Sequence, residues 1–118
     1  MQEMIRMKSI YAAKTKEDGR RILITRYYPR GVKKEHFDDW IRELAPSKEL
    51  LKQYKEGKIS WNKFEKKFLI QMNDEESAMK LQVLSTQAKK EPITLLCYEK
   101  NNHECHRHLV YDLLLENM

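Results

Sequence analysis

Two short, uninterrupted apolar runs constrain the fold of this chain more than any other feature. Residues 21–25 read Arg-Ile-Leu-Ile-Thr, and residues 93–98 read Ile-Thr-Leu-Leu-Cys-Tyr. Runs of this length that are rich in β-branched side chains and lack polar alternation are typical of strands covered on both faces. We therefore predict a buried strand in each run, and a shorter strand with partial alternation near residues 5–12.

Helical signals fill most of the interval between the two runs. Ser47, Ser60 and Asp74 are suitable N-cap residues, and each precedes a stretch with apolar side chains at helical spacing. A further helix is expected before Ser47, because four apolar residues share one helical stripe: Phe37, Trp40, Ile41 and Leu44. A last helix is expected from about His103, with Asn102 as its N-cap.

This order of elements predicts the fold class. Strands come first, then several helices, then a strand and a final helix, and no linker or repeat interrupts them. The order predicts an α/β fold with a small, mostly parallel β-sheet and helices packed on it. The length fits a single domain that spans residues 1–118.

The charge balance favours an anionic partner. Lysines and arginines number 23 against 18 acidic residues, which gives a formal net charge of +5 at pH 7. Acids are interleaved with bases along almost the whole chain, so a solvated surface of mixed charge is the other interpretation.

Cysteine usage and hydropathy favour a cytoplasmic protein that does not contact membranes. Cys97 and Cys105 form neither a disulfide framework nor a Cys-x-x-Cys pair, so we expect reduced thiols. No apolar run approaches the roughly 20 residues that cross a bilayer. Residues 1–9 lack the continuous apolar stretch of a signal peptide.

The glycines exclude common nucleotide-binding motifs. Gly19, Gly31 and Gly57 lie far apart, whereas a dinucleotide-binding loop and a P-loop both need closely spaced glycines. The chain also contains no Gly-x-Ser-x-Gly nucleophile elbow and no His-Glu-x-x-His helix. We therefore predict no cofactor.

Basic side chains follow the first buried strand, and others begin the last helix. In an open α/β sheet, ligands bind at the carboxyl ends of the strands, where these segments would meet. Guanidinium groups suit phosphate or carboxylate, so we expect an anionic ligand there. In the alternative, Arg26 and Arg30 pair with acids such as Asp38, Asp39 and Glu99 and only hold loops together. The candidate ligand-binding residues are Arg26, Tyr28, Arg30, Lys33, Lys34 and Arg107.

Cys105 and His106 are candidate catalytic residues. A thiol in the first turn of a helix beside Arg107 would have a lowered pKa, and His106 could carry its proton. Cysteine is also common as a small buried residue, and adjacent helical residues point about 100° apart. His103, Cys105, His106 and His108 cannot all converge on one ion within one and a half turns, so no metal site is predicted.

Several blocks along the chain form a recognisable series: residues 20–31, 33–35, Trp40, 44–47, Trp61 with Phe64, 93–96 and 105–107. In this order they resemble the compact branch of the domain of unknown function 488 family. The resemblance implies a three-layer α/β domain and no established activity. It carries Arg26, Arg30 and Lys34 (or Lys33) over as recurrent polar positions, while Thr25 stands where members commonly have an acid.

Three functional hypotheses follow from the residues. The first is a binding module for a phosphate-bearing ligand, either a nucleotide or a nucleic acid, in which tyrosine rings could stack on bases. The second is a Cys/His-dependent hydrolase or transferase in the same pocket, and the third is an interaction scaffold without chemistry. The first two require that the loop after the first buried strand faces the amino end of the last helix.

Overall fold

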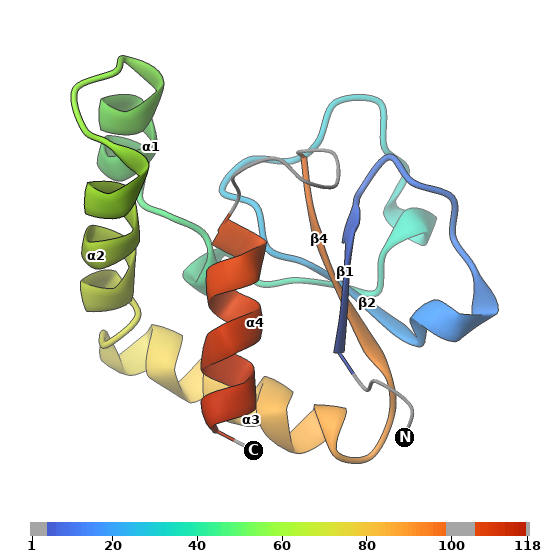
Figure 1. Ribbon diagram of the computed structural model, residues 1–118. Coiled ribbons are helices and arrows are strands. Elements are labelled where there is room, and N and C mark those ends of the chain that lie inside the picture. The colour runs from blue at the N-terminus through green and yellow to red at the C-terminus, as the bar shows by residue number, and fades with distance from the viewer. Residues whose placement is uncertain (1–4, 99–105, 118) are drawn as a thin grey trace.

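One parallel sheet organises the chain in the computed structural model, which describes residues 5–98 and 106–117. Within these ranges the sheet has four strands in the order β1-β4-β2-β3, all parallel (Figure 1). β4 is central: Ile93 is in register with Ile5 on one side and with Arg20 on the other. The strands are β1 Ile5–Ser9, β2 Arg20–Leu23, β3 Asp39–Trp40 and β4 Ile93–Cys97.

The α-helices begin largely where the sequence predicts. The Ser47 hydroxyl accepts a hydrogen bond from the Leu50 N–H at 3.1 Å, and Ser60 does the same for Lys63 at 3.2 Å. Asp74 occupies the N-cap position of the third helix without a capping hydrogen bond. The helices are α1 Lys48–Lys55, α2 Trp61–Gln71, α3 Glu75–Ala88 and α4 His106–Glu116; the short 3-10 helices are η1 Lys16–Asp18, η2 Lys34–His36 and η3 Arg42–Leu44. In the described part of the chain, no helix combines the length and apolar character required to cross a membrane.

The two faces of the sheet are covered by different kinds of structure. Ile22 and Leu95 join the main core with side chains from α2, α3 and α4, whereas Leu23 and Leu96 join a second cluster with Ile10. Because successive residues of a strand point to opposite faces, β2 and β4 are covered on both faces of the sheet, as their apolar runs indicate. The predicted α/β, three-layer arrangement is confirmed; the layer opposite the α-helices consists of loops with short 3-10 helices.

The predicted helix over residues 37–44 is wrong. Its apolar residues face two different clusters, with Phe37 and Trp40 against the loop-covered face and Leu44 in the main core. Pairing with β2 competes successfully for this segment, because Asp39 lies in register with Ile22. The indole N–H of Trp40 also donates to the Thr25 carbonyl at 2.7 Å. In this segment the apolar residues have helical spacing, but the backbone does not form the predicted helix.

Gly19 permits the close approach of β2 to β4. Its φ is +62°, and a Cβ at this position would lie 2.1 Å from the Pro92 carbonyl oxygen. The next residue, Arg20, donates its N–H to that same oxygen at 2.9 Å. Gly19 thus lies at the point where the two central strands begin to pair.

Candidate functional site

The carboxyl end of β2 meets the amino end of α4. The His106 imidazole shares a hydrogen bond with the Ile24 carbonyl, and the Tyr98 hydroxyl donates to the Tyr27 carbonyl. Figure 1 shows the segment after β2 and the start of α4 at the same end of the sheet. The structure therefore brings together the two regions on which the predicted site depends.

Arg26 is used to hold a neighbouring loop. Its Nε donates to the Pro46 carbonyl at 3.0 Å, and one terminal nitrogen donates to the Ala45 carbonyl at 3.1 Å. The half-buried side chain also lines a groove of about 290 Å³ whose wall includes Glu43 and Asp74. Arg26 thus holds a loop, as the alternative interpretation expected, but through backbone carbonyls instead of carboxylates.

Residues 26–34, which we call the cationic loop, carry three exposed basic side chains. Arg30, Lys33 and Lys34 make no side-chain hydrogen bond or ion pair with any residue that the structure describes. The backbone of the loop is nevertheless fixed, since the Tyr11 hydroxyl donates to the Arg30 carbonyl at 3.2 Å. Three charges are therefore held on an ordered backbone with their donors available.

The two tyrosines of the cationic loop have different environments. Tyr28 packs edge-on against Trp40 at 5.6 Å between ring centroids and donates its hydroxyl to the Val32 carbonyl at 2.7 Å. Tyr27 is 49% exposed, and its backbone carbonyl accepts hydrogen bonds from the hydroxyls of Thr25 and Tyr98. Tyr28, a candidate ligand contact from the sequence, is itself 40% exposed, so both tyrosines are accessible and Tyr27 is slightly more so.

His106 is buried at the start of α4. Burial lowers its pKa to about 4, helped by the positive charges of Arg107 and Arg26 and opposed by the hydrogen bond to Ile24. The imidazole is therefore neutral at pH 7, and its ring packs edge-on against Phe68 at 5.7 Å. The neutral ring donates its Nε2–H to a backbone carbonyl and so stabilises the start of the helix. With this pKa the imidazole is a weak base.

The other residues considered near α4 fall into three groups. Arg107 is only 1% exposed, so it contributes positive charge from inside the protein. His108 is exposed, and Asn102, His103 and Cys105 lie outside the described residues. Residues 5–98 and 106–117 contain no cluster of three side chains able to bind a metal ion.

Cys97, at the end of β4, corrects the expectation of reduced thiols. It is fully buried and disulfide-bonded. Its partner lies outside the described residues. The sequence gave no indication that Cys97 is bonded, because the chain carries no common disulfide framework.

Sequence analysis missed a buried ionic cluster on the loop-covered face of the sheet. This Asp18 cluster consists of Lys8, Thr15, Asp18 and Arg21. Asp18 and Arg21 have no exposed side-chain surface and form an ion pair, and Lys8 donates to both Asp18 oxygens at 3.0 Å. Burial alone would raise the pKa of Asp18, but donors from Thr15, Lys8 and Arg21 lower it to about 2. A charged residue within an otherwise apolar buried strand was the signal, because such an arginine needs a nearby acid.

Comparisons with known proteins match the whole described chain. Residues 5–118 match the family model described as "Active DUF488-N3 subclade". The uncharacterized protein YeaO of Escherichia coli is 35% identical over 112 residues, which covers 93% of this chain and 96% of that protein. The uncharacterized protein Rv3073c of Mycobacterium tuberculosis is 25% identical over 101 residues, or 84% and 86% of the two chains. No solved structure matches the chain. The chain therefore belongs to the domain of unknown function 488 family, as its sequence motifs indicated.

Proposed function

We propose that this protein binds a phosphate-bearing ligand, a nucleotide or a nucleic acid, on its cationic loop. One observation carries the proposal: Arg30, Lys33 and Lys34 are exposed, and no described residue neutralises them. Charges held close together without counterions attract an anion, and the gain is greatest for a ligand with several phosphates.

The surroundings of the loop support this choice of ligand. Tyr27 offers a half-exposed ring beside the cations, and bases stack on aromatic rings without strong sequence preference. Arg26 and Arg107 add positive charge from positions that the fold already uses. In this proposal Arg30, Lys33 and Lys34 contact phosphates and Tyr27 contacts a base, while Arg26, Tyr28 and Arg107 keep the loop and the helix start in place.

Fluorescence anisotropy with a short labelled oligothymidylate tests the proposal, with ATP and inorganic phosphate as competitors. The triple variant Arg30→Ala, Lys33→Ala, Lys34→Ala should bind more weakly. Its plot of log affinity against log salt concentration should be shallower by about 2, since each lost phosphate contact removes about 0.7 on a single strand. The competitors distinguish the two ligand classes. If the site binds a single nucleotide, ATP should displace the labelled oligothymidylate. If it binds a nucleic acid, the oligothymidylate should stay bound at the same ATP concentration.

A matched control removes equal charge elsewhere. Lys52, Lys55 and Lys66 are exposed on α1 and α2, so the triple alanine variant at these positions lowers the net charge by the same amount. Equal loss of affinity in both triple variants would show general charge attraction without a site. No binding of the labelled oligothymidylate by the wild type, together with no binding of ATP in a direct titration, would contradict the proposal.

An enzymatic role is the second candidate, because the matching family model is described as an active subclade, with no reaction named. Such a role would use Cys105 as nucleophile, and His106 offers it little help as a base at pH 7. Alkylation of Cys105 in reduced protein, followed by mass spectrometry across a pH series, tests this candidate. If Cys105 reacts only as the pH of the solution rises toward the ordinary thiol pKa of about 8.5, the enzymatic role is ruled out.

A further inference from the structure

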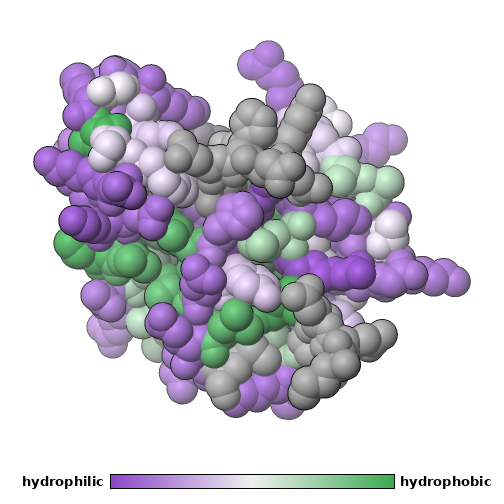
Figure 2. All heavy atoms as spheres, in the orientation of Figure 1, coloured by the Kyte–Doolittle hydropathy of each residue, from purple (hydrophilic) through white to green (hydrophobic). Residues whose placement is uncertain are grey.

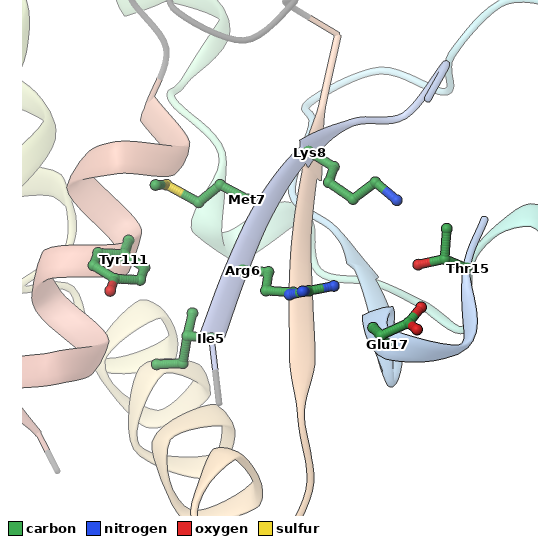
Figure 3. Close-up of a pocket in the computed structure, with 7 residues that line it drawn as sticks. All are labelled: Ile5, Arg6, Met7, Lys8, Thr15, Glu17 and Tyr111. Carbon is green, nitrogen blue, oxygen red and sulfur yellow. The ribbon is translucent and has the colours of Figure 1, made fainter. Parts of the chain in front are cut away.

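We propose that the outer edge of β1 accepts an extended peptide segment in which acidic and apolar residues alternate, added to the sheet as a further strand. This surface is separate from the cationic loop. A groove of about 690 Å³ runs along it, with Arg6, Met7 and Lys8 of β1 among the residues that line it (Figure 3).

The backbone of β1 has one edge available. β1 stands at the end of the strand order, and no other strand in the described ranges pairs with its outer side. Beyond the strand, Ile10 donates its N–H to the Cys97 carbonyl at 2.8 Å, so Ile10 directs its backbone groups toward β4. Because backbone groups alternate along a strand, those of Met7 point away from β4. An extended segment could therefore hydrogen-bond to β1 without displacing any strand of the described ranges.

The side chains along this edge alternate between two chemistries. Ile5 and Met7 lie on the side of α4, beside Tyr111, whereas Arg6 and Lys8 lie on the side of Thr15 and Glu17 (Figure 3). Figure 2 agrees, with apolar side chains between β1 and the lower part of α4 and hydrophilic ones on the other side of β1. A strand placed alongside β1 repeats this alternation, so its residues would meet apolar and basic surroundings in turn.

The charges select an acidic partner. The side chain of Arg6 is 42% exposed, and its recorded ion pair with Asp18 is long, at 3.9 Å. Lys8 is already bound to Asp18 and to the Ala13 carbonyl, so Arg6 is the cation with donors to spare. Among the described residues that line the groove, Glu17 is the one carboxylate, against the two cations Arg6 and Lys8. A second copy of β1 would bring Arg6 and Lys8 against their own equivalents, and like charges oppose such pairing.

The test uses labelled probe peptides of alternating glutamate and valine. We expect the peptide to bind wild-type protein, and a peptide of alternating lysine and valine to bind at least tenfold more weakly. A glutamate-valine peptide N-methylated at every second residue, on the edge that would face β1, should also lose binding, because it cannot donate backbone hydrogen bonds. Equal binding of the N-methylated and unmodified peptides would overturn strand addition.

Variants locate the binding edge. Arg6→Glu should weaken glutamate-valine binding about tenfold, the effect of losing and reversing one interfacial charge. Lys66→Glu, on the exposed surface of α2, makes the same kind of charge reversal and should leave it unchanged. Circular dichroism establishes that both variants fold, and oligothymidylate binding by Arg6→Glu reports on the cationic loop independently. Unaltered peptide binding by folded Arg6→Glu, or a wild-type dimer that the peptide does not dissociate, would overturn the proposal.

Discussion

Arg21 in the Asp18 cluster and Arg30 in the cationic loop are nine positions apart in sequence, yet the fold uses them in opposite ways. Arg21 is fully buried, pairs with Asp18, and donates its Nε to the His36 carbonyl at 2.8 Å. Arg30 is exposed, and among the described residues only its backbone carbonyl is engaged, by Tyr11. The first arginine connects η1 and η2 to the sheet, and the second is available to a ligand.

The two residues are of the same type and differ in the number of described partners, which is the basis for assigning Arg21 to the structure and for proposing Arg30 as a ligand contact. A buried charge is tolerated only when paired and hydrogen-bonded, so the Asp18 cluster had to acquire its donors and acceptors. An exposed charge needs no partner to fold, so a lack of partners in the cationic loop costs no stability. The predictions below test this contrast.

The largest effect is expected from removing the buried carboxylate. Asp18→Asn leaves Arg21 charged and buried without its ion-pair partner, which should lower the free energy of unfolding by about 3–5 kcal/mol. Asp39→Asn breaks the exposed pair with Arg20 and should cost less than about 1 kcal/mol. Urea denaturation of both variants measures the difference, and similar losses would remove the distinction between the two kinds of charge.

The buried imidazole of His106 should make stability depend on pH in a defined window. Its folded-state pKa of about 4 lies below the ordinary 6.5, so the unfolded chain takes up the proton first as pH falls. The contribution of His106 to the free energy of unfolding should therefore be constant above pH 6.5 and decrease as the pH falls from 6.5 to about 4. The total loss should be about 3 kcal/mol, because each pH unit of difference corresponds to 1.36 kcal/mol.

His106→Gln isolates this contribution, because glutamine keeps an N–H donor and does not titrate. The difference between wild type and variant should shrink steadily across the window. Asp18 also makes stability fall with pH, but in a lower window, between pH 3.8 and about 2. At the lower end of that window its carboxylate becomes protonated in the folded protein as well. Stability curves of wild type and His106→Gln that run parallel from pH 7 to pH 4 would show that the imidazole is not held neutral by the fold.

The two tyrosines should separate stability from binding. Tyr28→Ala loses the ring contacts with Phe37 and Trp40 and should lower the free energy of unfolding by about 1–2 kcal/mol. Tyr27→Ala should leave stability nearly unchanged and weaken oligothymidylate binding by about 1–3 kcal/mol through lost stacking. The opposite result, in which Tyr27→Ala is the destabilising variant, would mean that the exposed ring has a structural role.

The smallest effect on stability is expected in the cationic loop. The triple variant at Arg30, Lys33 and Lys34 should unfold within about 0.5 kcal/mol of wild type, because these side chains have no described partners to lose. Thermal and urea denaturation both report this value. A loss above 1 kcal/mol would place these cations in the same structural class as Arg21.

Much of the fold could be predicted because local signals agreed with the tertiary arrangement. The two apolar runs became the central strands β2 and β4, and Ser47 and Ser60 begin their helices with the expected hydrogen bonds. The segment from Phe37 to Leu44 failed because its spacing fits a helix while its partners lie in another part of the chain. The segment pairs with β2, and its own sequence contains no local signal for this pairing.

The site was predictable in position and less so in detail. The ends of strands in a parallel sheet gather at one edge, so the meeting of β2 and α4 followed from topology. The different ring contacts of the two exposed tyrosines did not, because the contact of Tyr28 depends on Trp40, which the predicted helix had placed elsewhere. The burial of Arg107 likewise depends on packing between elements that are distant in sequence.

A titration of ¹⁵N-labelled protein with oligothymidylate, followed by NMR, tests the central claim most directly. If the cationic loop binds phosphate, the largest amide shift changes should occur in residues 26–34 and spread to the first turn of α4, which adjoins the loop through His106 and Ile24. Shift changes concentrated along β1, or on the α1 and α2 surface, with residues 26–34 unaffected, would contradict it.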